Sequence, residues 1–428
     1  MDNTLNKTDN FDWLENFEIE SNPLYSNSSV QSVIGGANQS SDETNQSEAN
    51  QSSNEEDRLF NGLFAPLAEL FTFTEESEVP LTKTVTVGNP EGTQFTFNFA
   101  EDTPQEVIDG VKQAGSNWSA VLTDDVDLTI DFIFQPIEGG LIGQTRPNFL
   151  PLEYSAVKEA LVEDSTSSDD QTAVANLPAE TVNYLINNTA ENNGSDTPYL
   201  DDNNGSNNSL INMTRANAKA LGFEAEELAI AFGLTPEDGA NLPDANIAFN
   251  NEVNWDYDRS NGIAADAYDF VGTVEHELGH ALGFWSNADV LNSVSNTKIG
   301  GVIEGLATEG IQELVANSGL KSVADSISAD RLFSENEYLP TTLDLFRFTP
   351  ESFVQDARDF TASNIDGKYF SIDGGETEIA AMTEVLGLSH WQEGLGIGLM
   401  DSSFELGDKT EISDTDLLAF DAIGWDVV

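Results

Sequence analysis

The sequence predicts an α+β fold for the chain after residue 80. Several short segments alternate apolar and polar residues, which is typical of half-buried strands. Other segments repeat apolar residues three or four positions apart, as helices do when they bury one face. With 428 residues, 39% of them hydrophobic, the chain is long and apolar enough for a substantial core in one or two domains.

The expected elements follow one another along the chain. The segments TKTVTVG and TQFTFNF predict two strands after residue 80. A helix is expected from Thr103 to Leu122, because Pro104 suits a first helical turn and the apolar residues that follow have helical spacing. Further strands are expected at 126–134 and 244–250, and further helices at 154–164 and 214–223.

Residues 1–80 have the composition of an acidic tail. The segment 38–56, NQSSDETNQSEANQSSNEE, repeats Asn-Gln-Ser without an apolar period. Such a segment cannot bury enough surface to offset the entropy of ordering it, so disorder is predicted. The apolar stretch at 58–73 predicts a short helix that packs on the chain's own domain, with a propeptide-like or partner-binding role as the alternative.

The charge balance restricts the possible partners. The chain has 76 Asp and Glu against 16 Lys and Arg, a formal net charge of −60. This field repels nucleic acids and anionic membranes, so neither is expected as a partner. Since the chain has no cysteine, disulfides, thiol catalysis and cysteine-based zinc sites are excluded.

Membrane insertion and the Sec export route are not expected either. No apolar run approaches the length of a transmembrane helix, and the N-terminus lacks a basic start followed by an apolar run. We expect an extracellular or cell-surface protein that leaves the cell by another route.

The segment VEHELGHALGF, 274–284, contains two of the three histidines of the chain. Apolar residues recur three or four apart from Ala267 to Leu282 and predict an amphipathic helix. His276 and His280 lie on its other face, which we expect to line an opening. They are one turn apart, so both imidazoles can bind the same metal ion, and imidazole suits zinc.

Glu277 has a different position on the same helix. It follows His276 by about 100° around the axis, which is unfavourable for joining the same coordination sphere. It can instead hydrogen-bond a water held by the ion. Zinc lowers the pKa of bound water to about 7, and a carboxylate beside it can accept the proton. The pattern predicts a catalytic zinc ion (Zn²⁺) with Glu277 as the general base.

A catalytic zinc site usually has three protein ligands and one open position. The residues alone leave the third ligand open among His390, Asp289, Glu304, Glu309 and Glu313. In the pattern HExxHxxGxxH the third histidine would stand at position 286, but that residue is a serine.

HELGHALGF, a long insertion, then SHW at 389–391 and a methionine ten residues after His390 resemble the leishmanolysin branch of the metzincins. The chain is also similar to a group of bacterial metalloproteases related to that branch. The phrases that carry this similarity are TRANAKALG (214–222), FSIDGG (370–375), SHW (389–391) and DAIGWD (421–426). The resemblance covers roughly residues 90–428.

The resemblance implies a metzincin-like zincin and assigns its site residues. His276, His280 and His390 would bind one zinc ion, and Glu277 would be the catalytic base and acid. Met400 would be the Met-turn residue, an apolar floor beneath the metal and not a ligand.

The resemblance also implies how the chain is divided. A mixed β-sheet with the active-site helix would lie above a cleft, and a mostly helical or irregular C-terminal subdomain would lie below it. After the tail, 1–80, the upper subdomain would be 81–284. The lower one, 285–428, would contain a helical insertion at 302–328. An edge strand, expected at 244–250, would pair with an extended substrate.

The function expected on this basis is zinc-dependent endopeptidase activity on protein or peptide substrates. Two alternatives stay open: a non-catalytic acidic surface or matrix protein with a structural metal site, and a zinc hydrolase of non-peptide substrates. Calcium (Ca²⁺) binding is also open at LDDNNGSNNS, 200–209. That segment lacks the EF-hand spacing and is predicted to be a solvated turn.

Overall fold

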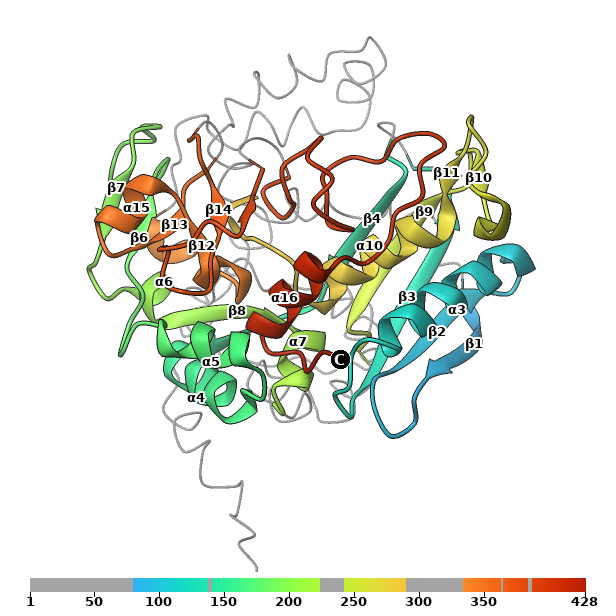
Figure 1. Cartoon of the computed structure of the whole chain (residues 1–428), viewed down its shortest axis with the longest axis horizontal. Coiled ribbons are helices and arrows are strands. Elements are labelled where there is room, and N and C mark those ends of the chain that lie inside the picture. Colours follow the sequence, from blue (N-terminus) through green and yellow to red (C-terminus); the bar gives the residue numbers. More distant parts are fainter. Residues whose placement is uncertain (1–79, 138–140, 224–241, 290–333, 363–364, 384–386) are drawn as a thin grey trace, which may run out of the picture.

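The computed structural model describes residues 80–137, 141–223, 242–289, 334–362, 365–383 and 387–428. Within these ranges the chain has an α+β fold, as predicted, with one five-stranded mixed sheet and several smaller sheets (Figure 1). The predictions for the tail up to residue 79, for the helix at 58–73 and for the insertion at 302–328 lie outside the described residues.

The five-stranded sheet holds most of the predicted strands. Its first two strands are antiparallel, its three middle strands are mutually parallel, and its last strand is antiparallel again. The phenylalanines of the second strand alternate into the core, as the period-two pattern predicts. The order is β1 (Leu81–Gly88), β2 (Gln94–Ala100), β3 (Asp127–Gln135), β9 (Ala245–Asn250) and β4 (Gly143–Pro147).

The strand predicted at 244–250 exists, but its predicted edge position is wrong. β9 pairs with β3 on one side and with β4 on the other. Its nearly continuous burial, with the apolar run Ile247–Phe249, is typical of an interior strand. The sheet edge is therefore formed by β4, whose polar sequence GQTRP does not predict a strand.

Two helices, α3 (Gln105–Ser119) and α10 (Phe270–Leu282), cover the same face of this sheet (Figure 1). The histidine-bearing helix α10 starts three residues later than predicted. Asp269 caps it by accepting a hydrogen bond from the backbone N–H of Gly272, and Tyr268–Asp269 forms a short strand, β11. The helix ends at Gly283, whose φ of 119° is left-handed and therefore favours glycine.

Smaller sheets and helices make up the rest of the described chain. The short strand β13 (Arg358–Phe360) pairs in parallel with β6 (Tyr184–Ile186). One sheet therefore contains a strand that precedes α10 in the sequence and a strand that follows it. The other strands are β5 (Phe149–Glu153), β7 (Tyr199–Asp201), β8 (Leu210–Thr214), β10 (Trp255–Asp256), β12 (Arg347–Phe348), β14 (Tyr369–Phe370) and β15 (Ala380–Ala381).

The remaining helices are short, and the predicted helix at 154–164 is present with these bounds. The helix predicted at 214–223 spans only 215–220. The helices are α4 (Tyr154–Asp164), α5 (Ser168–Ala175), α6 (Ser206–Ser209), α7 (Arg215–Ala220), α15 (Pro350–Val354) and α16 (Asp414–Ala422), with 3-10 turns η5 (Arg259–Asn261), η6 (Glu335–Glu337) and η7 (Leu343–Phe346).

The segment 200–209, predicted to be a solvated turn, is partly buried. It contains the end of β7 and all of α6, and Asn207 and Asn208 are buried. Both carboxylate oxygens of Asp201 accept hydrogen bonds, one from the backbone N–H of Asn203 and one from the Asn207 amide. Other polar groups of the segment bond to neighbouring chain: the Asn208 amide donates to the Val182 carbonyl, and the Asn336 side chain accepts from the backbone N–H of Ser206.

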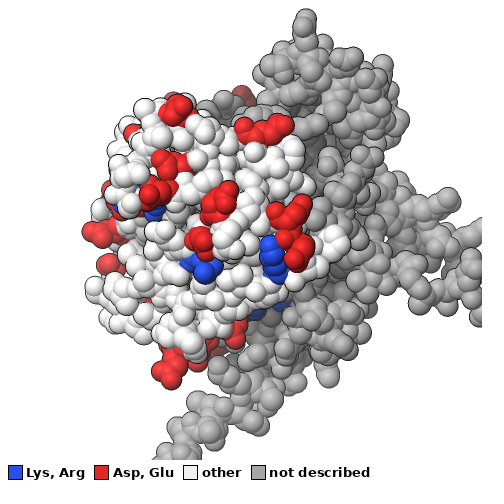
Figure 2. All heavy atoms as spheres, turned by 90° about the vertical axis from the view of Figure 1, so that its right-hand side faces the viewer, with Lys and Arg blue, Asp and Glu red and all other residues white. Residues whose placement is uncertain are grey.

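The surface reflects the acidic composition. Figure 2 shows, on the face that includes α3 and β1, Asp and Glu side chains scattered among neutral residues with few Lys or Arg. The described residues on this face form no basic patch of the kind that nucleic-acid binding uses. In the part of the chain that the structure describes, no helix combines the length and apolar character needed to cross a bilayer.

The contact between α3 and α10 gives a prediction about stability. A Cβ atom at Gly110 would lie 2.5 Å from a ring carbon of Phe270. Although alanine is the better helix former, Gly110→Ala is expected to destabilise the fold by about 1–3 kcal/mol through overpacking. Thermal unfolding measures this, with Gln113→Ala at an exposed position of the same helix as the control. A more stable Gly110→Ala protein would contradict the packing argument.

Candidate metal centre

The helix α10 is buried on all sides. All 13 of its residues are buried, and His276, Glu277 and His280 are only 3%, 6% and 5% exposed. The face that carries the histidines is thus covered, where the sequence predicted an opening. The cover includes the chain around Met400, which approaches closely because Gly279 has no side chain: a Cβ there would lie 2.5 Å from the Met400 sulfur.

The three histidines of the chain converge on one point. The Nε2 atom of His280 lies 3.1 Å from Nε2 of His276 and 3.1 Å from Nε2 of His390. Two nitrogens bound to one tetrahedral zinc ion are about 3.3 Å apart, since each Zn–N bond is about 2.0–2.1 Å long. Three imidazole nitrogens at this spacing could hold one metal ion.

The other ring nitrogen of each histidine faces a backbone carbonyl oxygen. His276 Nδ1 is 2.8 Å from the oxygen of Leu399, His280 Nδ1 is 2.8 Å from that of Phe284, and His390 Nδ1 is 2.7 Å from that of Gly387. A carbonyl can only accept, so each Nδ1 carries the proton. The Nε2 lone pairs then point at one another. They would repel each other without a cation between them, and a bound metal ion turns this repulsion into coordination.

Burial keeps these imidazoles in the ligand form. Together with the neighbouring His390, it lowers the pKa of His276 to about 3. Burial likewise lowers the pKa of His280 well below its ordinary value, and lowers that of His390. All three side chains are therefore neutral at pH 7, as metal binding requires.

Glu277 follows His276 in α10 and is held by the edge strand β4. One carboxylate oxygen, Oε2, accepts a 2.7 Å hydrogen bond from the Thr145 hydroxyl. Burial raises the pKa of Glu277 to about 7, against the opposing effect of this hydrogen bond. The other oxygen, Oε1, faces Gly143, where a Cβ would lie only 2.9 Å away. The sequence does not indicate Thr145 as a site residue, because the segment GQTRP of β4 shows no strand pattern.

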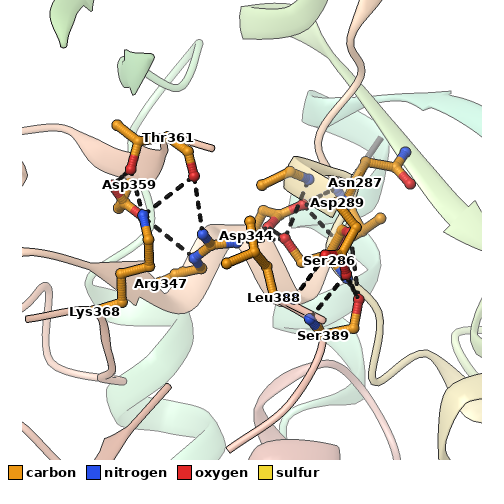
Figure 3. A network of polar contacts seen from close by, with 12 residues as sticks. Ser286, Asn287, Asp289, Asp344, Arg347, Asp359, Thr361, Lys368, Leu388 and Ser389 are labelled. Carbon is orange, nitrogen blue, oxygen red and sulfur yellow. Dashed lines mark hydrogen bonds and ion pairs between the residues drawn. The ribbon is translucent and has the colours of Figure 1, made fainter. Parts of the chain in front are cut away.

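His390 is held by hydrogen bonds between the two ends of the long insertion. The carboxylate of Asp289 accepts bonds from the backbone N–H of Leu388, at 2.7 Å, and from the N–H and hydroxyl of Ser389, at 3.0 and 2.7 Å (Figure 3). The backbone N–H of Ser286 donates to the Ser389 hydroxyl at 2.9 Å. His280 and His390 are separated by 109 residues in the sequence. These hydrogen bonds hold the chain just after α10 next to the chain just before His390.

Ser286 occupies the position that a compact metzincin pattern gives to the third histidine. Its hydroxyl donates to Asp344 at 2.6 Å and accepts a hydrogen bond from Arg347. Arg347 forms an ion pair with Asp359, which also binds Lys368 at 2.9 Å (Figure 3). Although burial alone would raise it, these two cations hold the pKa of Asp359 below its ordinary value. This buried network fixes Ser286, whose backbone N–H bonds to Ser389, the residue before His390.

Met400 is fully buried and lies against Gly279. Gly279 stands between the two histidines of α10 in the sequence. Asp416, near the start of α16, fixes this part of the chain. Its carboxylate accepts hydrogen bonds from the backbone N–H groups of Leu399 and Met400, at 2.7 and 3.2 Å, and from the Trp391 indole at 2.8 Å. The sequence indicates Asp416 only as part of a helix cap.

The structure therefore brings the three histidines together and places Met400 against α10. Glu277 follows His276 in the same helix, and β4 holds its carboxylate. Of the alternative third ligands, Asp289 lies nearby but its oxygens hold the loop of His390. Glu304, Glu309 and Glu313 lie outside the described residues. Comparisons of the chain with protein-family models, with curated proteins and with solved structures find no match.

The role of Asp289 can be tested through metal affinity. Asp289→Ala removes the acceptor that orients the chain before His390, so zinc affinity is expected to fall about 10–100-fold, as is usual when a group that supports a ligand is lost. Competition with a chromogenic chelator measures this. The control is Glu393→Ala, which removes an exposed carboxylate three residues after His390. Unchanged affinity in Asp289→Ala would refute this role.

Proposed function

We propose that this chain is a zinc-dependent endopeptidase of the metzincin type. The observation that carries the proposal is the convergence of three neutral imidazoles beside a buried glutamate that is not one of the cluster. Three nitrogen donors with tetrahedral spacing suit zinc and leave one coordination position for substrate or water. A purely structural site has no use for Glu277.

The chain's own residues have separate tasks in the proposed reaction. Zinc, when bound, polarises a peptide carbonyl and makes a neighbouring water acidic. Glu277 accepts the proton of the attacking water at Oε1, while Thr145 holds Oε2 and thereby orients the carboxylate. A pKa near 7 suits both this step and the later transfer of the proton to the leaving amine.

The edge strand supports a peptide as the substrate. Among the described residues, β4 pairs only with β9, so its outer edge is free for another extended chain. Thr145 lies on β4 and contacts Glu277, which means that a peptide paired along β4 would pass this carboxylate. Strand addition of this kind provides backbone hydrogen bonds for affinity and side-chain pockets for specificity. It is less suited to the alternative of a non-peptide substrate.

One observation favours the alternative of a structural metal site. His276, His280 and Glu277 are almost completely buried, whereas a catalytic centre needs access for its substrate. In that case the three imidazoles would hold the chain around His390 against α10. The two functions differ in what Glu277 does, so a variant of this residue separates them.

The test is hydrolysis of an unfolded general protein substrate by the full chain and by Glu277→Gln. The glutamine keeps the volume and can still accept the Thr145 hydrogen bond. We expect turnover in the parent and a loss of about 10²–10⁴-fold in the variant, the usual contribution of a general base. Zinc content and the unfolding temperature should stay the same.

Two other results would count against the proposal. Equal turnover in both proteins would exclude Glu277 as the base. Absence of turnover in both, with zinc bound to both, would favour the structural site. Glu252→Gln, at an exposed position, is the matched control for loss of a carboxylate.

A further inference from the structure

The chain from Met400 to Thr410, here called the covering segment, lies along the histidine face of α10. A Cβ atom at Gly279 would lie 2.5 Å from the Met400 sulfur, and a Cβ atom at Gly272 would meet the Thr410 hydroxyl. The segment therefore crosses the helix between these two glycines, and His276 stands between them in the sequence. Figure 1 shows this part of the chain, in dark red, passing α10 on its way to α16.

Phe404, in the middle of the covering segment, lies against His276. The two ring centroids are 4.9 Å apart and the ring planes form an angle of 78°, which is an edge-to-face contact. His276 is only 3% exposed, whereas Phe404 is partly exposed and is not packed against the main hydrophobic core. The phenyl ring therefore separates the imidazole from solvent on this side of the helix.

Both ends of the covering segment are fixed by hydrogen bonds. At the first end, the Asp416 carboxylate accepts from the backbone N–H of Met400 at 3.2 Å. At the other end, the N–H of Thr410 donates to the Asp269 carboxylate at 3.2 Å, and the Arg259 guanidinium donates to the Thr410 carbonyl. Arg259 also forms an ion pair with Asp269 at 2.9 Å. Residues from the start of α10 and from α16 thus keep the two ends in place.

The middle of the covering segment lacks such bonds. Within the described part of the chain, no group accepts a hydrogen bond from the backbone N–H of any residue from 402 to 406. The Glu405 carbonyl accepts from the N–H of Asp408 at 3.3 Å, which is a bond inside the segment. The next anchor is Gly407, whose N–H donates to the Ala267 carbonyl at 2.9 Å. The stretch 402–406 is therefore held against α10 by a ring contact and not by hydrogen bonds.

Trp285, the aromatic residue beside His280, is held more firmly. Its ring centroid lies 5.7 Å from that of His280 and 5.8 Å from that of Phe149 on β5. Its indole N–H donates to the side-chain oxygen of Asn287 at 3.1 Å. Of these two aromatic neighbours of the histidine cluster, Phe404 is thus the one that can move without breaking a hydrogen bond.

We propose that Phe404 is a movable cover over the metal centre, and that the stretch 402–406 leaves α10 to admit a substrate. This inference rests on the proposed metal site and peptidase activity. It explains how residues as buried as His276 and Glu277 can belong to a catalytic centre, since the motion of a few loop residues opens and closes many active sites. The fixed first end leaves the hydrogen bond between His276 and the Leu399 carbonyl in place while the cover moves.

The experiment measures how fast zinc enters and leaves the full chain. Phe404→Ala removes the ring. The matched control, Leu406→Ala, removes an apolar side chain of the same stretch that is 50% exposed. All these proteins carry Glu277→Gln to prevent self-digestion. Stopped-flow mixing of zinc with the metal-free chain gives the association rate constant, and transfer of zinc to an excess of a chromogenic chelator gives the dissociation rate constant.

We expect Phe404→Ala to raise both rate constants about tenfold, because the edge-to-face contact that keeps the cover closed is lost. The dissociation constant for zinc should change less than about twofold, since a cover slows entry and exit equally and does not alter the free energy of the bound state. Leu406→Ala should match the parent in all three quantities.

Unchanged rate constants in Phe404→Ala would overturn the cover. Faster dissociation with unchanged association would also overturn it, because the ring would then stabilise His276 as a ligand without blocking the path of the ion. If Phe404→Ala does not fold, Phe404→Leu, which keeps an apolar side chain, decides by the same criteria.

The cover and the peptidase activity can fail separately. Faster zinc exchange in Phe404→Ala, combined with no peptide hydrolysis by the chain that retains Glu277, would support the cover and refute the peptidase. Hydrolysis by that chain with unchanged zinc exchange would refute the cover alone. A parent chain that binds no zinc would refute both.

Discussion

The hydrogen bonds between the chain just after α10 and the chain just before His390 are the constraint on which the histidine cluster depends. Asp289 binds two successive backbone N–H groups and one hydroxyl, and Ser286 adds a bond to the same hydroxyl. Hydrogen bonds to a charged group each contribute about 1.5–3 kcal/mol when buried. They offset the entropy of closing a long loop, which grows only slowly with its length. A distant histidine can therefore replace one supplied by the same helix.

Close backbone approach at glycine is the second condition for this site. Gly279 lets the chain of Met400 lie directly on α10, and Gly143 leaves space at the free oxygen of Glu277. The edge strand β4 would connect the proposed general base with the proposed substrate path, because Thr145 holds Glu277 from the strand along which a peptide would pair. Chemistry and substrate binding would thus share one structural element.

Buried charge is handled in two different ways in this acidic protein. Near Ser286, the carboxylate of Asp359 is balanced by Arg347 and Lys368, so it remains ionised without any external ion. Near the C-terminus, the aspartates around Asp421 have no such partner among the described residues. The first group is thus neutralised by basic side chains, whereas burial and the nearby Asp170 raise the pKa of Asp421 to about 7.

The sequence by itself determined the local features of this protein. The strands β1, β2, β3 and β9, the helices α3 and α4, and the candidate residues on α10 all follow from periodicity and spacing, which are properties of neighbouring residues. The resemblance added His390 and Met400. Only the tertiary structure decided that β4 and not β9 is the sheet edge, that the histidine face of α10 is covered, and that Thr145, Asp289 and Asp416 orient the site. Those facts depend on pairing and contacts between segments far apart in the chain, for which no local pattern exists.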